Sequence, residues 1–325
     1  VVLSGGLDSS IIAALCHDSA TATNSNIPEC WTVAGSEENP DYIFSESVAN
    51  HLDLKFNSKI IENDVFYKQL PNFSWHGEDL DISVLFWQPL FQEMSKHVSV
   101  GLCGQGADEL HAGYQRYKDL DSHYKLIKSR LDDTNNSLDL NFPTGPGSPW
   151  RDKKIFHNNN FSNLISTLQF EIDRGQLSNF QLRLADRHSM AFGLEARVPF
   201  LNYRHRHESY KVPLNWKVSH KEEKMALREA AKLTKLPKIV TSRPKMPAGT
   251  ATTPSLLSSF MEELTPHAIE WSKEYGILSD ILRKQPDMAV GIRLFHSLHM
   301  TERGVNFSKN NLMDLLEDVG SWAIN

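Results

Sequence analysis

Cysteine is scarce in this sequence: only three of its 325 residues are cysteines, and they are Cys16, Cys30 and Cys103. No two of them form a C-x-x-C pair, so the sequence indicates neither a zinc knuckle nor a disulfide framework. Few and widely spaced cysteines are typical of a reducing compartment. We therefore expect a cytoplasmic protein.

Long apolar runs and an excess of positive charge are also missing. No uninterrupted stretch is long enough to cross a bilayer and no signal peptide is visible, so we expect no membrane partner. The 34 Lys and Arg residues stand against 40 Asp and Glu residues, a formal net charge of -6. This composition argues against nucleic acid as a partner. The chain is 40% hydrophobic, which is enough for one large core or two modest ones.

What the sequence does contain is an alternation of predicted strands and helices over residues 1–115. Apolar runs predict strands at residues 1–4, 30–35, 54–61 and 98–103. Helical patterns lie over residues 9–18, 40–52, 84–97 and from 107 onward, and Pro89 should kink or limit the third. This alternation predicts an α/β fold with a doubly wound, mostly parallel sheet that helices cover on both faces.

The rest of the chain has a different composition. Residues 132–160 are rich in Asn, Pro, Gly and Ser, and we interpret them as a loop-rich insertion. From residue 163 to residue 325 the pattern is mainly helical, and residues 255–325 are typical of amphipathic packing helices. We therefore predict an α/β part at residues 1–117, an insertion at 132–160 and a helical part at 163–325.

The chain opens on V-V-L-S-G-G-L-D-S-S, a predicted strand that turns into a helix. Two glycines let the backbone approach a ligand closely, and a helix N-terminus favours an anion such as phosphate. The lysine of the P-loop pattern is absent, but a carboxylate, Asp8, is present. A carboxylate repels phosphate unless a divalent cation lies between them, so we interpret Asp8 as a Mg²⁺ ligand. The alternative is an ordinary tight turn with Asp8 as helix cap.

A second cluster of glycines and acids follows the strand predicted at 98–103. Gly104 and Gly106 precede Asp108 and Glu109, which repeats the order of strand, glycine turn, acid and helix. Ligands of open parallel sheets bind beyond the carboxyl ends of the strands. We therefore expect the two turns to face one another and Asp8 and Asp108 to share Mg²⁺ on a triphosphate. The alternative for the second pair is an acidic first turn favoured by the helix dipole.

Four segments in order carry a family resemblance over residues 1–247. They are L-S-G-G-L-D-S-S at 3–10, G-Q-G-A-D-E-L-H-A-G-Y at 104–114, A-D-R-H-S-M-A-F-G-L-E-A-R-V-P-F-L-N-Y-R at 185–204, and the segment from K-E-E-K to R-P-K-M-P at 221–247. Together they resemble the synthetase domain of glutamine-dependent asparagine synthetases, within the ATP pyrophosphatase superfamily. The resemblance implies one synthetase domain over residues 1–325, with nucleotide bound by residues 1–117.

The resemblance also implies a reaction and its cofactors, ATP and Mg²⁺. A carboxylate attacks the α-phosphorus of ATP to give an acyl-adenylate and pyrophosphate, and an amine then displaces AMP. The expected substrates are aspartate and ammonia, and the expected product is asparagine.

Site residues follow from the same resemblance. Asp8 and Asp108 would hold Mg²⁺, and Lys245 would offset the charge that develops on leaving pyrophosphate, with help from Arg243. Lys224 and Arg228 are weaker candidates, and we interpret Lys224 as part of a solvated helical face. Glu195 and Arg197 are expected to be a structural pair. The residues expected to bind ATP or pyrophosphate are Val2, Ser4, Gly5, Gly6, Asp8, Ser9, Val33, Cys103 and Gly104.

The sequence departs from the family pattern at several positions. Gln105 stands where the family often has Glu, so it keeps hydrogen bonding at a catalytic position but cannot act as a base. Glu109 is a possible substitute base, although its expected place in the first turn of a helix can direct its side chain away from the site. Asn202 replaces an Asp, and L-H-A-G-Y replaces F-G-G-Y. The chain begins at Val1 inside its first predicted strand, so we expect a longer protein with an N-terminal glutaminase domain or partner, and a homodimer is a further expectation.

Three alternatives remain open at this point. The first is an amide-forming ligase or cyclase of secondary metabolism, of the β-lactam or peptide cyclase type, in which relatives carry Tyr at the position of Gln105. The second is a non-catalytic nucleotide-binding relative. The third is a tRNA-modifying ATP pyrophosphatase, for which paired cysteines or a basic extension would be expected.

Overall fold

The described residues contain two short parallel sheets. The computed structural model describes residues 1–123, 125, 164–173, 175–246, 253–317 and 319, so the insertion predicted at 132–160 lies outside the described residues. Strand β1 (Cys30–Ala34) pairs in parallel with β2 (Phe56–Ile60). Strand β3 (Val100–Leu102) pairs in parallel with β4 (Glu195–Arg197).

Residues 1–3 connect the two sheets through backbone hydrogen bonds. The Val2 amide donates to the Leu102 carbonyl, while the Leu3 amide donates to the Trp31 carbonyl on the other side. The strand predicted at residues 1–4 is nonetheless reduced to a single parallel bridge between Val2 and Trp31. The described residues thus form a mixed α/β, mostly helical structure with small parallel sheets, and a full doubly wound sheet is not seen among them.

Alternate side chains of these segments pack against helices on opposite sides. Leu3 and Cys30 belong to a core with the buried residues of α1 (Leu7–Thr23) and α2 (Pro40–His51). Trp31 and Cys103 instead pack with α4 (Trp87–Met94). Helix α4 is shorter than the helix predicted at residues 84–97. Pro89 lies in the first turn of α4, where the missing N–H of proline costs little.

The remaining elements are mainly helical, as predicted for residues 163–325. The exception is β4, which lies inside a segment that we expected to be helical. In chain order the other elements are α3 (Asn63–Gly77), η1 (Ile82–Val84), α5 (Ala107–His111), η2 (Gln115–Lys118), α8 (Leu164–Asp173), η5 (Leu177–Gln181), α9 (Leu182–Met190), η6 (Pro199–Leu201), α10 (Tyr203–Lys211), α11 (Leu214–Lys217), α12 (Met225–Ala231), α13 (Lys238–Thr241), α14 (Thr253–Ser272), η7 (Lys273–Leu278), α15 (Ser279–Arg283), α16 (Pro286–Met300), η8 (Glu302–Lys309) and α17 (Leu312–Leu316).

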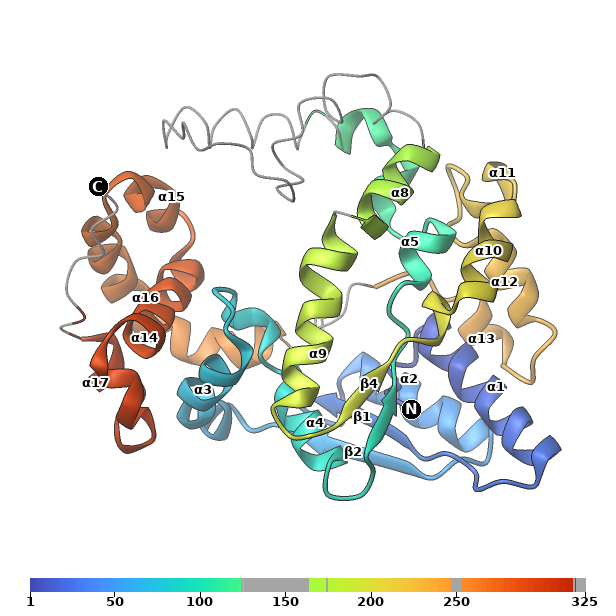
Figure 1. Ribbon diagram of the computed structural model, residues 1–325, viewed down its shortest axis with the longest axis horizontal. Helices are drawn as coiled ribbons and strands as arrows, with labels where there is room; N and C mark the ends of the chain where they lie inside the picture. The colour runs from blue at the N-terminus through green and yellow to red at the C-terminus, as the bar shows by residue number, and fades with distance from the viewer. Residues whose placement is uncertain (124, 126–163, 174, 247–252, 318, 320–325) are drawn as a thin grey trace.

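The C-terminal helices form a second core with α3 and η1. Phe73 of α3 is buried in one cluster with Leu264 of α14, Leu294 of α16 and Leu315 of α17. Figure 1 shows these helices gathered beside α3, at the opposite end of the molecule from α1. Within the described ranges, none of the helices combines the length and the apolar character needed to cross a bilayer.

Candidate functional site

The opening glycine turn is held tightly between α1 and α2. Gly5 has a φ of +63°, and a Cβ on it would lie 2.4 Å from the Phe44 Cβ, so only glycine fits here. The backbone amide of Ser4 donates to the Ser9 hydroxyl, which in turn donates to the Gly6 carbonyl. Gly6 is the N-cap of α1, and Asp8 follows in the first turn without capping it. The structure therefore does not support Asp8 as a simple helix cap.

The second glycine turn faces the first, as the sequence predicted. A Cβ on Gly104 would lie 3.1 Å from the Asp8 Cβ and 3.2 Å from the Ser9 amide nitrogen. Gly106, with a φ of +88°, is the N-cap of α5, and Asp108 lies in the first turn of that helix. Two carboxylates are thus brought together from the ends of two parallel segments.

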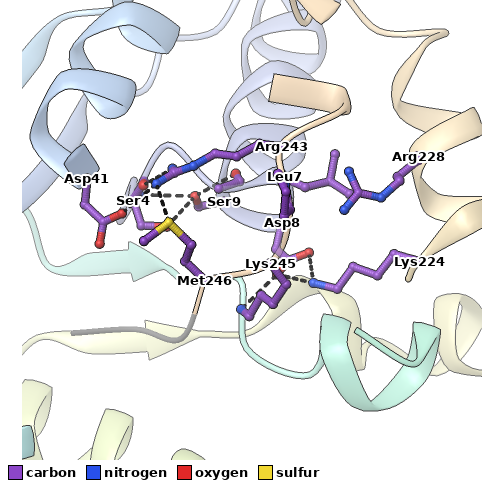
Figure 2. Close-up of a pocket in the computed structure, with 12 residues that line it drawn as sticks. Ser4, Leu7, Asp8, Ser9, Asp41, Lys224, Arg228, Arg243, Lys245 and Met246 are labelled. Carbon is purple, nitrogen blue, oxygen red and sulfur yellow. Dashed lines mark hydrogen bonds and ion pairs between the residues drawn. The ribbon is translucent and has the colours of Figure 1, made fainter. Parts of the chain in front are cut away.

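Two lysines lie between these carboxylates. The Lys224 Nζ is 2.5 and 2.6 Å from the two carboxylate oxygens of Asp8 and 2.6 Å from Oδ1 of Asp108. The Lys245 Nζ is 2.7 Å from Oδ2 of Asp108 and 3.6 Å from Oδ2 of Asp8. Figure 2 shows both lysine side chains reaching toward Asp8. The cluster therefore contains two negative and two positive charges.

The prediction for Lys224 was wrong. The residue is 1% exposed and does not lie on a solvated helical face. Its backbone is left-handed, with a φ of 55°, and it precedes α12 as the N-cap residue. Lys224 therefore does not continue the surface of α12. Its side chain points inward and reaches Asp8.

The two lysines hold the site in its charged form. Burial by itself would raise the pKa of Asp108, but the Lys224 and Lys245 ammonium groups outweigh it and lower the pKa to about 2. Burial by itself would lower the pKa of Lys245, but Asp108 and Asp8 raise it above its usual value. Both groups therefore remain ionised at neutral pH.

Gly113 makes room for this cluster, and the sequence analysis did not single it out. A Cβ on Gly113 would lie 2.0 Å from both Oδ1 of Asp108 and Cε of Lys224. Any side chain at this position would therefore separate the ion pair. The signal in the sequence was the glycine of L-H-A-G-Y, which follows shortly after the acids.

Arg243 fastens the opening turn to α2. Its guanidinium donates to the Ser4 carbonyl at 3.2 Å and to Oδ1 of Asp41 at 3.0 Å. The same group lies over the Phe44 ring, 4.0 Å from the ring centre. Arg243 is thus fully engaged in holding the turn, while Lys245 is the cation of the R-P-K segment that meets the acids.

A pocket opens beside the turn, and Figure 2 shows the residues that line it. Six of the predicted site residues are among them: Ser4, Gly6, Asp8, Ser9, Arg243 and Lys245. Lys224 and Arg228, the weaker candidates, also line the pocket, and the remaining lining residues are Leu7, Asp41, Pro244 and Met246.

The other predicted site residues are not part of this lining. Cys103 is buried against Trp31 and α4, its amide donates to the Arg197 carbonyl, and burial raises the pKa of its thiol to about 12. Val2 and Val33 pack on the same cluster. Gln105 is half-buried in the second turn. The pocket lining also leaves out Gly5 and Gly104, which belong to the two turns, and Asp108, which belongs to the ion cluster.

Four further residues that the sequence singled out lie outside the pocket lining. Glu109 is fully buried, and burial, followed by the nearby Asp108, raises its pKa to about 7. Glu195 and Arg197 form an exposed ion pair with each other, 2.9 Å apart, as expected for a structural pair. Asn202 caps α10 by accepting from the Arg204 amide, so the change from Asp keeps the cap.

The two carboxylates suit a hard divalent cation. Both converge on one point, the Lys224 nitrogen, at no more than 2.6 Å. Mg²⁺ is commonly held by one or two carboxylates together with phosphate oxygens and water. Within the part of the chain that the structure describes, no group of three or more His, Cys, Asp or Glu side chains is placed to hold a metal by itself. Two carboxylates supply only part of a Mg²⁺ coordination shell, and in this structure the Lys224 nitrogen lies at the point where they converge.

Comparisons with known proteins point to one family. The family model described as "Asparagine synthase" matches residues 1–278. The glutamine-hydrolyzing asparagine synthetase of Bos taurus is 25% identical over 296 residues, which cover 89% of this chain and 43% of that protein. Glutamine-hydrolyzing asparagine synthetase 1 of Bacillus subtilis strain 168 is 26% identical over 289 residues, covering 75% and 45%. The chain thus spans less than half the length of these relatives.

Proposed function

The chain belongs to the asparagine synthase family, and on this premise we propose that it forms an amide bond through an acyl-adenylate, with ATP consumed and AMP and pyrophosphate released. The proposed reaction makes asparagine from aspartate and ammonia. The observation that carries the proposal is the convergence of Asp8, Asp108, Lys224 and Lys245 beside a glycine turn and a pocket.

The residues of the pocket have roles that suit this chemistry. The Ser4–Ser9 turn presents backbone N–H groups at the start of α1, where a pyrophosphate group is favoured. Lys245 and Lys224 place two positive charges where negative charge grows on the departing pyrophosphate, which lowers the barrier. Arg243 and Asp41 fix the turn in position. The substrate carboxylate must then lie in line with the leaving group.

Mg²⁺ is part of the proposal because one or two carboxylates together with phosphate oxygens are the ligands that it commonly uses in proteins. Asp8 and Asp108 are the residues that would hold it. When bound, Mg²⁺ would offset the negative charge of the phosphates.

Gln105 favours a second candidate, an amide-forming ligase or cyclase that takes another carboxylate or amine. A glutamine cannot accept a proton from an incoming ammonium group, whereas a glutamate can. This candidate shares the adenylation step and differs only in its substrates.

Pyrophosphate release tests the adenylation step. The chain is incubated with ATP, Mg²⁺, ammonium chloride and each amino acid in turn. We expect release that requires both ATP and a carboxylate, and mass spectrometry with aspartate should detect asparagine. Asp8→Ala should abolish release, while Asp18→Ala, an exposed acid on the same helix, should not.

Two results would count against the proposal. Release that survives Asp8→Ala would remove the turn from the mechanism. Tight ATP binding in calorimetry without pyrophosphate release under any donor would favour a non-catalytic relative. Release with carboxylates other than aspartate would instead select the second candidate.

A further inference from the structure

Lys224 adopts a backbone conformation that a lysine does not favour. Its φ of 55° and ψ of 34° lie in the left-handed region, which is unfavourable for a residue with a Cβ. Such a conformation persists only where the surroundings hold it. The same conformation brings the ammonium group to Asp8 and Asp108, so whatever holds the backbone of Lys224 also places the charge.

The preceding residue, Glu223, is anchored through both its backbone and its side chain. Its carbonyl accepts from Nε of Arg228 at 2.8 Å, and its backbone forms a bridge with Val218. Oε1 accepts from Nη2 of Arg228 at 2.8 Å and from the backbone amide of Lys245 at 3.0 Å. Oε2 lies 2.8 Å from Nζ of Lys118.

One carboxylate therefore joins the two segments that supply the lysines. Glu223 is next to Lys224 in the chain and binds the backbone of Lys245 across 22 residues. Burial alone would raise the pKa of Glu223, but Lys118 and the Lys245 amide lower it to about 2. Because the side chain is 7% exposed, these bonds have little competition from water.

We propose that Glu223 is a positioning residue, which holds Lys224 and Lys245 so that their ammonium groups meet Asp8 and Asp108. The role rests on the proposed function of the site. Glu222 lacks this role: its side chain is 51% exposed, and its oxygen lies 3.6 Å from Nε of Arg228. It is thus a carboxylate at the adjacent position that serves as a matched control.

Lysine acetylation followed by peptide mass spectrometry tests the placement without relying on activity. The full chain is treated briefly with an acetylating reagent, and the rate of modification is read at each lysine. Glu223→Ala removes the oxygen that accepts from Arg228 and from the Lys245 amide. We expect several-fold faster modification of Lys224 and Lys245 in Glu223→Ala, and unchanged rates in Glu222→Ala.

Lys217 serves in the same spectra as a control for unfolding of the whole protein. It is buried away from the acids and donates to the carbonyls of Leu110 and Ser209. Equal acceleration at Lys217, Lys224 and Lys245 would mean general unfolding and would overturn the proposal. Unchanged rates at Lys224 and Lys245 would overturn it as well. Lys118→Met, which removes one partner of Glu223, should give a smaller change in the same two lysines.

Kinetics then separate positioning from binding. In Glu223→Ala we expect kcat for pyrophosphate release to fall about tenfold to a hundredfold, with a much smaller change in KM for ATP, because misplaced cations cost most in the transition state. A change in KM alone would contradict the proposal. If the wild-type chain released no pyrophosphate, the acetylation rates would still show whether Glu223 positions Lys224 and Lys245. Failure of the proposed function can therefore be distinguished from failure of the positioning role.

Discussion

At the scale of single residues, each charge of the site depends on the others. Lys224 and Lys245 together neutralise Asp8 and Asp108, so removal of one lysine leaves two buried carboxylates that share a single ammonium group. Breaking a buried pair in this way typically costs about 3–5 kcal/mol. Lys224→Met should therefore lower the melting temperature in the absence of divalent cations.

Mg²⁺ should restore part of that stability, because the two carboxylates converge where the ammonium nitrogen lay. We expect Mg²⁺ to raise the melting temperature of Lys224→Met clearly more than that of the wild type, in calorimetry with and without the metal. The double variant Lys224→Met/Asp8→Asn should lose the response. An equal response in all three proteins would mean that Mg²⁺ does not use these acids.

The sequence could predict the acids of the site but not the arrangement of its cations. The two glycine turns and the R-P-K segment identify Asp8, Asp108 and Lys245 because strand ends and glycine turns have recognisable local patterns. Lys224 lies in K-E-E-K before a helix, a pattern typical of a solvated face. Its burial depends on a left-handed backbone and on the space left by Gly113, and both are set by contacts between distant segments.

At the scale of elements, the strand that sequence reasoning missed is β4. Its residues, Glu195, Ala196 and Arg197, include two exposed charges and no apolar run. The segment is a strand because β3 offers it a parallel partner, with Val100 opposite Glu195. Strand formation of this kind follows from tertiary context and not from local preference. The helices α1 and α2, with their apolar spacing, were predictable.

Helix α9 contributes a pH-sensitive group. His188 is 1% exposed, and neither ring nitrogen has a hydrogen-bond partner among the described residues. Burial, with a smaller effect of Arg187, lowers its pKa from 6.5 to about 4. The folded state therefore keeps the ring neutral, while the unfolded state binds a proton below pH 6.5. Its contribution to stability is present above pH 6.5 and is lost as the pH falls toward 4.

His188→Leu should remove this sensitivity to acid. As the pH falls from 6.5 to 4, the free energy of unfolding of the wild type should decrease relative to that of the variant. The difference should reach up to about 3 kcal/mol, at about 1.4 kcal/mol per unit of pKa shift. Urea unfolding at several pH values measures the difference. His207→Leu, at an exposed position, is the control. A difference between His188→Leu and the wild type that does not vary with pH would contradict the expectation.

At the scale of the whole molecule, one hydrophobic core contains residues on both sides of position 278, where the family match ends. That match stops at residue 278, yet one buried cluster joins Phe66, Leu70 and Phe73 of α3 to helices α16 and α17. Gly291 allows the close approach, because a Cβ on it would lie 1.9 Å from the Leu80 carbonyl oxygen. The residues after 278 therefore complete a core that begins near residue 61.

A chain ending at residue 278 should consequently fail to fold stably. It would lose nine buried residues of this cluster. The large aliphatic side chains among them are each worth about 1.5–3 kcal/mol of burial, and the loss is at least comparable with the total stability of a typical domain, about 5–15 kcal/mol. The nine are Leu282, Ala289, Val290, Ile292, Leu294, Leu298, Leu312, Leu315 and Leu316. We expect residues 1–278 to bind a hydrophobic dye and to lack a cooperative urea transition, whereas full-length Val305→Ser, altered at an exposed site in the same region, should unfold as the wild type does. A cooperative transition for residues 1–278 with unchanged midpoint would show that the family segment folds independently.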